Sequence, residues 1–267
     1  MFTKHELEKF EKYIRSALFA AGNEVALGFK SKDFLLSTKE DLSPLTDVDI
    51  KSQRIITQAL GEKFPEAEFI AEEAIRPDAE NFSNKVFFSI DPLDGTSNFS
   101  IGIPLFTISA SLHYGNESLV GCLLDPIHGE YFHAIKGAGA YLNDKPIHIA
   151  PYVPLEDSFI DINVAKLDAE IMSRIMNRIG RRTKKVRCMG CISLEIAWIA
   201  AGRIHAAINH YLSIWDISAC GLILEEAGGK WSMLSNEKPE FPYLGKFAVC
   251  AASTSRLHSE LIGLINK

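Results

Sequence analysis

The N-terminal part of the chain has the hydrophobic spacing of an amphipathic helix. Apolar residues recur there every three or four positions, at Leu7, Phe10, Ile14, Leu18, Ala21 and Val25. This spacing places them on one face and predicts a helix over residues 5–28. A second helix is predicted over residues 47–61, where Gly61 ends the pattern.

The middle of the chain has the pattern of strands. The apolar run KVFFSI at residues 85–90 is typical of a buried strand. From residue 105 to residue 150, apolar segments are separated by turn-forming pairs such as Gly115-Asn116 and Asn143-Asp144. Strands are therefore expected at residues 105–114, 118–125, 129–135 and 139–143.

After residue 157, strands alternate with helices. We expect strands at residues 158–163, 204–209 and 246–251, and helices at residues 167–179, 192–202, 216–227 and 254–266. A run of strands followed by such alternation indicates layered sheets and helices, an α/β or α+β fold. Two prolines in the segment 149–157 place a join near residue 150. We expect halves at residues 1–150 and 151–267 that act as a single functional unit.

Composition and charge narrow the function classes. The net charge of −6 argues against general binding to nucleic acids or membrane surfaces, and the basic cluster at residues 178–187 is interpreted as a solvated face. No apolar run reaches the roughly 18 residues of a membrane span. The N-terminal helix mixes both charge signs, unlike a signal peptide. Five cysteines without disulfide-like spacing fit a reducing compartment, so we expect a cytoplasmic protein.

Cys188 and Cys191 form a CxxC pair that allows three interpretations. A redox motif would lie after a strand and open a helix, which is roughly where this pair lies. A zinc site would need a second pair, and the sequence has none. We interpret the pair as two small residues that begin a helix.

The segment DPLDGTSNF at residues 91–99 contains more acidic residues than a turn requires. Pro92 fixes the backbone between Asp91 and Asp94, so both carboxylates and the carbonyl of Leu93 can converge on one point. Oxygen-only ligands of this kind favour Mg²⁺, with Mn²⁺ as an alternative. Gly95 allows close approach to a ligand, and residues 95–99 can open a helical turn whose N–H groups receive a phosphate.

Further acidic residues are candidates for the same site, although each has a simpler structural explanation. Asp216, and Asp47 or Thr46, could cap the helices that follow them, and Glu72-Glu73 could lie in a solvated loop. Placed together, Glu72, Asp91, Asp94 and Asp216 carry four negative charges, which a cleft cannot hold without compensation. Two Mg²⁺ ions would neutralise them and form a clamp for displacement at phosphorus.

The sequence resembles the inositol monophosphatase family of Mg²⁺-dependent, lithium-sensitive phosphatases. The resemblance rests on AEE (71–73), DPLDGTSNF (91–99) and WDISACGLILEEAGG (215–229), supported by PLTDVD (44–49) and GAGAYLNDKPI (137–147). It covers essentially the whole chain. It implies the layered α-β-α-β-α sandwich shared with fructose-1,6-bisphosphatase, a homodimer, and a phosphoric monoester hydrolase that uses two or three metal ions.

By this resemblance, residue roles can be assigned. The metal ligands would be Glu72, Asp91, the carbonyl of Leu93, Asp94 and Asp216. Glu73 would assist catalysis, for instance at a third ion, and Asp47 with Thr96 would position and deprotonate the attacking water. The residues expected to contact phosphate or substrate are Asp94, Gly95, Thr96, Ser97, Gly190, Cys191, Ile192, Asn209 and Asp216.

Two positions depart from the family pattern. Asn209 stands where inositol phosphatases usually carry a glutamate that contacts sugar hydroxyls, and Ile192 replaces a small residue. Both changes should alter how a polyol ring is held. A loop around residues 30–43, which carries Lys39, is a candidate for closing over the substrate.

The resemblance leaves the substrate open, and it also leaves open a regulatory role other than catalysis. The first hypothesis is a phosphomonoesterase for a small polyol or sugar phosphate such as inositol 1-phosphate, acting through metal-activated water. The alternatives are a phosphatase for fructose 1,6-bisphosphate, histidinol phosphate or 3′-phosphoadenosine 5′-phosphate. A regulatory binding protein associated with the transcription or ribosome machinery is the hypothesis from another class.

Overall fold

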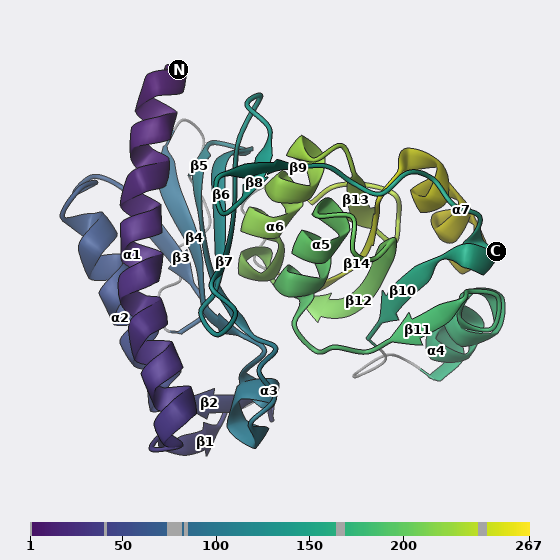
Figure 1. Ribbon diagram of the computed structural model, residues 1–267, viewed down its shortest axis with the longest axis horizontal. Helices are drawn as coiled ribbons and strands as arrows, with labels where there is room; N and C mark the ends of the chain where they lie inside the picture. Colours follow the sequence, from purple (N-terminus) through teal and green to yellow (C-terminus); the bar gives the residue numbers. More distant parts are fainter. Residues whose placement is uncertain (1, 40–41, 74–81, 83–84, 164–168, 240–244) are drawn as a thin grey trace.

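The computed structural model describes residues 2–39, 42–73, 82, 85–163, 169–239 and 245–267. The chain folds into alternating layers of helix and sheet (Figure 1). Helices α1 (Lys4–Ser31) and α2 (Asp47–Gly61) form the first layer. Both predicted N-terminal helices are confirmed, with α1 extending three residues beyond the predicted end. Its first turn is closed by a capping box between Thr3 and Glu6.

The second layer is a large sheet built from the middle of the chain. Within the described residues it has seven strands in sequence order, all antiparallel except for the parallel pair β3–β4. They are β3 (Glu68–Ala71), β4 (Val86–Asp94), β5 (Thr107–Tyr114), β6 (Glu117–Asp125), β7 (Glu130–Ile135), β8 (Ala140–Leu142) and β9 (Lys145–Ile147). The predicted run of strands is confirmed, although β3 and β9 were too short to be recognised from their pattern.

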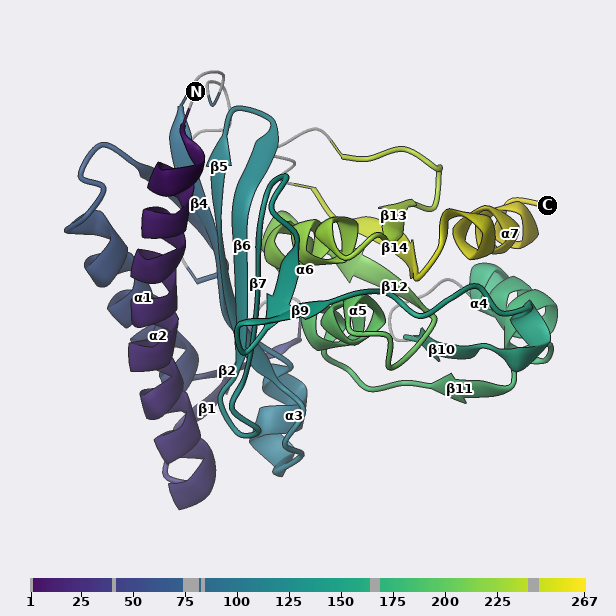
Figure 2. The same ribbon diagram turned by 45° about the horizontal axis from the view of Figure 1, so that its top comes forward.

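The C-terminal part supplies the remaining layers. Helices α5 (Ile192–Ala200) and α6 (Ile214–Glu226) lie between the large sheet and a second sheet of order β11-β10-β12-β14-β13 (Figures 1 and 2). Helices α4 (Ala169–Ile175) and α7 (Ser255–Ile265) cover the far face. The strands are β10 (Phe159–Ile162), β11 (Lys185–Arg187), β12 (Ala206–Leu212), β13 (Lys230–Met233) and β14 (Phe247–Ala252). The expected α-β-α-β-α sandwich is therefore present.

Hydrophobic clusters between successive layers hold the sandwich together. One cluster joins α1 and α2 to the large sheet, as in the packing of Ile14 and Ile56 with Phe88. Another lies around α5 and α6, between Phe87 of the large sheet and Val249 of the second. Each buried side chain of this size contributes roughly 1.5–3 kcal/mol relative to the exposed state. The division into halves at residue 150 stays a prediction.

Several element boundaries differ from those expected. Strand β4 was predicted to end at residue 90 but continues to Asp94, through an irregularity in its pairing with β5 between Asp91 and Asp94. Pro92 lies in this irregularity, where its missing N–H breaks the ladder of hydrogen bonds. Helix α4 ends at Ile175 and passes into a π-helical turn at Met176–Gly180, and residues 167–168 lie outside the described residues.

Smaller elements complete the fold. The hairpin β1 (Leu36–Thr38) and β2 (Pro44–Thr46) precedes α2, and the short helix α3 (Thr96–Ile101) follows β4. A 3₁₀ turn at Leu155–Asp157 lies in the join between the sheets. None of the helices formed by the described residues is both long and apolar enough to span a membrane.

Candidate active site

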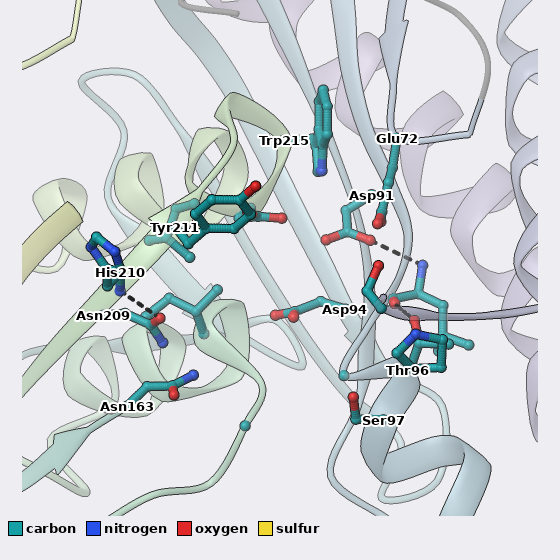
Figure 3. Close-up of a pocket in the computed structure, with 18 of the residues that line it drawn as sticks. Glu72, Asp91, Asp94, Thr96, Ser97, Asn163, Asn209, His210, Tyr211 and Trp215 are labelled. Carbon is teal, nitrogen blue, oxygen red and sulfur yellow. Dashed lines mark hydrogen bonds between the residues drawn. The ribbon is translucent and has the colours of Figure 1, made fainter. Parts of the chain in front are cut away.

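A pocket of about 240 Å³ lies where the end of β4, the start of α6 and the end of β12 meet. Figure 3 shows Glu72, Asp91 and Thr96 on one side of it and Asn163, Asn209 and Tyr211 on the other. The predicted residues that line it are Glu72, Asp91, Leu93, Asp94, Gly95, Thr96, Ser97, Gly190, Ile192, Asn209 and Asp216. The fold thus gathers residues that are far apart in the sequence.

The end of β4 fixes the first acidic residues. Asp91 is buried, and its Oδ1 accepts a hydrogen bond of 3.0 Å from the N–H of Leu93. Ser52 of α2 donates a hydrogen bond of 2.7 Å to the carbonyl of Pro92, which holds the kink in place. Burial, together with the negative charges of Glu72 and Asp94, raises the pKa of Asp91 well above its ordinary value.

Asp94 is oriented by the C-terminal half of the chain. Its Oδ2 accepts hydrogen bonds from the N–H of Ser193 at 2.8 Å and from Ser193 Oγ at 2.5 Å. Cys191 Sγ donates to the same oxygen at 3.3 Å. Cys191 is buried behind Asp94 and does not line the pocket, so its predicted substrate contact is not seen. Cys188 is exposed, and the CxxC pair forms no disulfide.

Asp216 both caps a helix and faces the pocket. Its Oδ2 accepts a 2.7 Å hydrogen bond from the N–H of Ser213, the N-cap residue of α6. Removal from bulk water, with added repulsion from Asp94 and Glu72, raises the pKa of Asp216 to about 8. The two explanations considered for this residue are therefore compatible, because the cap leaves its carboxylate in the pocket wall.

Lys39 balances part of this negative charge. Its Nζ lies 2.6 Å from Glu72 Oε1 and also forms an ion pair with Glu73. Burial lowers the pKa of Lys39, but the two glutamates outweigh it and the net shift is upward. Glu73 does not line the pocket. The loop that carries Lys39 thus reaches the acidic side of the pocket.

The expected contact between Asp47 and Thr96 is not formed in the structure. Asp47 Oδ1 instead accepts a hydrogen bond from the N–H of Leu35, and its Oδ2 pairs with Lys51 at 2.8 Å. Thr96 Oγ1 lies 3.0 Å from Oδ1 of Asp49, a buried residue that the sequence analysis did not select. Positions 47 and 49 are about 200° apart around a helix, so only one of them can face Thr96.

The side of the pocket opposite the acidic residues is built on a buried carboxyl pair. Asp161 and Glu195 are both fully buried, and burial raises the pKa of each carboxyl group. Asp161 Oδ2 accepts from the N–H of Met189 at 3.0 Å, and Glu195 Oε1 accepts from that of Cys191 at 3.2 Å. The pair therefore fixes the loop that carries Gly190. Sequence patterns gave no signal for it.

Asn209 is engaged by the same network. Its Nδ2 donates to Glu195 Oε2 at 3.4 Å, and its Oδ1 accepts from the N–H of His210 at 2.8 Å. The lining residues that sequence analysis missed are Ser43, Pro44, Asn163, His210, Tyr211, Leu212, Trp215 and Lys246. Pro44 and Trp215 belong to matched motifs, but the others come from loops and a bulged strand end without a recognisable pattern.

The acidic residues of the pocket fit a hard divalent cation. Their donors are all oxygens, and burial, with added repulsion between the carboxylates, raises the pKa values of Asp91, Asp94 and Asp216. Among the described residues, no three His, Cys, Asp or Glu side chains are already arranged to hold one ion together. A cation bound between these carboxylates would offset the repulsion between them. The chemistry of the donors therefore fits Mg²⁺ or Mn²⁺.

Comparison with known proteins places the chain in a family. The family model described as the inositol monophosphatase family matches residues 6–267. The chain belongs to the inositol monophosphatase family. Membership in this family indicates a phosphatase, and the family is Mg²⁺-dependent. The fold and the acidic pocket described above are consistent with that class.

Relatives within the inositol monophosphatase family carry two kinds of name. An inositol monophosphatase of Dictyostelium discoideum is 30% identical over 227 residues, covering 82% of this chain and 84% of that protein. The Nus factor SuhB of Pasteurella multocida is 30% identical over 213 residues, covering 78% and 79%. The crystal structure of the extragenic suppressor protein suhB from Bartonella henselae superposes with a TM-score of 0.87 at 25% identity, covering 96% of this chain and 98% of that one.

Proposed function

We propose that the protein is a Mg²⁺-dependent phosphomonoesterase that hydrolyses a small polyol or sugar phosphate. The observation that supports this proposal is the convergence of Glu72, Asp91, Asp94 and Asp216 on one pocket beside the Thr96–Asp49 pair. The pocket of about 240 Å³ is small for a ligand site, which favours a small phosphorylated metabolite.

The acidic side of the pocket would hold the metal. Two or three Mg²⁺ ions, or Mn²⁺, would be bound by Glu72, Asp91, the Leu93 carbonyl, Asp94 and Asp216, with Glu73 assisting. When bound, such ions supply charge compensation and polarise the phosphoryl group. Ser193 keeps one oxygen of Asp94 occupied through two hydrogen bonds, which fixes the orientation of its other oxygen. Lys39 must share Glu72 with the metal or withdraw from it.

Thr96 and Asp49 would handle the attacking water. Thr96 Oγ1 lies 2.8 Å from the carbonyl of Leu93 and 3.0 Å from Asp49 Oδ1, so it can relay a proton from a water molecule to the carboxylate. Burial raises the pKa of Asp49, which makes its carboxylate a better proton acceptor. The role first assigned to Asp47 thus passes to Asp49.

The phosphate would bind at the first turn of α3. Gly95 has a left-handed backbone with φ of 90°, and a Cβ there would lie 2.8 Å from the carbonyl oxygen of Leu105. Only glycine fits this position without a backbone shift. We expect the N–H groups of Gly95 and Thr96, with Ser97, to bind the phosphate oxygens.

A second candidate role comes from the relatives named Nus factor SuhB. By analogy, the protein would act in transcription through a surface other than the pocket. The name alone supports this role, whereas the acidic pocket supports the phosphatase. The two roles are compatible. Homodimerisation and cytoplasmic location stay predictions.

A phosphate-release screen tests the proposal. The purified protein would be assayed with inositol 1-phosphate, fructose 1,6-bisphosphate, histidinol phosphate and 3′-phosphoadenosine 5′-phosphate. Each assay would be repeated with Mg²⁺, with EDTA, and with added lithium. We expect release of phosphate from at least one substrate, dependent on Mg²⁺. No release from any of them, with Mn²⁺ binding intact, would favour the transcription role instead.

A further inference from the structure

The pocket contains a cation held between two aromatic rings. Lys246 Nζ lies 5.1 Å from the centre of the Tyr211 ring and 5.6 Å from that of Trp215. It also donates a hydrogen bond of 2.6 Å to Ser213 Oγ. Of the described residues that line the pocket, Lys246 is the only lysine or arginine. Lys39 is paired with Glu72 and Glu73, so it is already committed to the acidic side.

The backbone conformation at Tyr211 directs its ring toward Lys246. Tyr211 has a φ of 65°, a left-handed conformation that is uncommon for a residue other than glycine. It lies in an irregularity of the β12–β14 pairing, between Asn209 and Leu212. Such bulges redirect side chains and occur beside functional sites. Figure 3 shows the Tyr211 ring beside the pocket, across from Asp91 and Thr96.

The other polar groups on this side are poorly suited to recognising a polyol. Both ends of the Asn209 amide are used within the protein, by Glu195 and by the N–H of His210. Ile192, Leu212 and the aromatic rings make much of the remaining surface apolar. A ring of hydroxyl groups would find Asn163 and His210 as its remaining polar partners on this side. An anionic group would find a lysine.

We propose that Lys246, with Tyr211, binds a second anionic group on the alcohol that leaves the phosphorus. The preferred substrate is then doubly anionic, with a phosphate or a carboxylate in addition to the phosphate that is hydrolysed. This inference rests on the proposed phosphatase function. The ammonium group has three N–H donors, and Ser213 takes one. Lys246 is exposed, so an arriving anion need not displace a buried partner.

Matched substrate pairs test the proposal. The phosphate arm compares fructose 1,6-bisphosphate with fructose 1-phosphate, and the carboxylate arm compares 3-phosphoglycerate with glycerol 1-phosphate. We expect kcat/KM to be at least about tenfold higher for the doubly anionic member of one pair, the effect of one charge-assisted hydrogen bond. The arm that shows this preference identifies the second group. Equal values in both arms would overturn the proposal.

Variants assign the effect to the residue. Lys246→Met should remove the preference, by lowering kcat/KM for the doubly anionic substrate about tenfold or more while leaving its singly anionic partner within about twofold. Lys246→Arg should retain it. Lys238→Met is the matched control, because Lys238 pairs with Glu225 and does not line the pocket. An equal loss for both substrates would mean that Lys246 serves the reacting phosphate, and no loss would mean that it binds nothing. Either result overturns the proposal.

A binding measurement separates this inference from the phosphatase proposal. Titration calorimetry with fructose 6-phosphate, fructose and inorganic phosphate requires no turnover. Weaker binding of fructose 6-phosphate to Lys246→Met, with binding of inorganic phosphate unchanged, supports the anion site even if no substrate is hydrolysed. Unchanged binding of fructose 6-phosphate overturns it.

Discussion

Asp49 provides the sharpest test of how the water is activated. Its carboxylate accepts hydrogen bonds from the Thr46 N–H at 2.8 Å and from Thr46 Oγ1 at 2.5 Å, and it lies 3.0 Å from Thr96 Oγ1. In Asp49→Asn the amide oxygen can still accept from Thr46, and the amide N–H can donate to Thr96. The substitution therefore keeps the helix cap and removes the base.

Asp49→Asn should change kcat far more than it changes the free energy of unfolding. Losing a general base lowers kcat about 10²- to 10⁴-fold, equivalent to roughly 3–5 kcal/mol of activation free energy at about 1.4 kcal/mol per factor of ten. Exchanging one charge-assisted hydrogen bond for a neutral one should change the free energy of unfolding by only about 1 kcal/mol. Phosphate release and denaturant unfolding, measured on the same preparations, give the two numbers.

Asp47→Asn is the matched control. Asp47 pairs at the surface with Lys51, a contact of 2.8 Å that solvent screens. We expect its kcat to stay within about twofold of the unsubstituted protein, because Asp47 does not touch Thr96. If Asp47→Asn loses activity and Asp49→Asn keeps it, the Thr96–Asp49 assignment is refuted.

Three further predictions concern the metal and phosphate sites. Asp94→Asn should reduce phosphate release by several orders of magnitude while the protein stays folded by circular dichroism, and substantial turnover at millimolar Mg²⁺ would contradict the ligand assignment. Gly95→Ala should destabilise the fold by roughly 1–2 kcal/mol because of its left-handed backbone alone, and it should also lower phosphate release. Gly102→Ala is the matched control, because Gly102 has a similar φ but no atom lies within 4 Å of the new Cβ. It should introduce the same backbone strain without the loss of activity. The native state raises the pKa of Asp216 from 3.8 to about 8. Between about pH 4 and about pH 8 the folded protein therefore holds a proton on Asp216 that the unfolded chain has released. Without metal, the free energy of unfolding should fall as the pH rises from about 4 to about 8. Saturating Mg²⁺ should reduce that slope in thermal unfolding, and equal slopes with and without Mg²⁺ would count against a metal at Asp216.

Long periodic segments could be predicted from the sequence. Helices α1 and α2 are recognisable because one face of each is apolar over several turns. Strands such as β1, β11 and β13 span three or four residues and offer too few positions for a period to show. Strand β4 ran past its predicted end because a bulge lets pairing resume beyond Pro92, and pairing partners are not visible in one sequence.

The candidate site was predictable to a similar degree. Asp91 and Asp94 stood out because two acids around a proline exceed what a turn needs. The resemblance pairs Asp47 with Thr96, whereas Thr46 and Asp49 have the spacing of a capping box, which ties Asp49 to the first turn of α2. Tyr211 and Lys246 meet only through a bulge and the β12–β14 pairing, so no local pattern reveals them.

The central claim is that the acidic pocket is a metal-dependent phosphatase site, and the most direct test is phosphate release measured against Mg²⁺ concentration. We expect turnover that is absent in EDTA, rises with Mg²⁺ to saturation, and disappears in Asp94→Asn at every Mg²⁺ concentration. Turnover that persists in EDTA, or that is equal in Asp94→Asn and the unsubstituted protein, would contradict it.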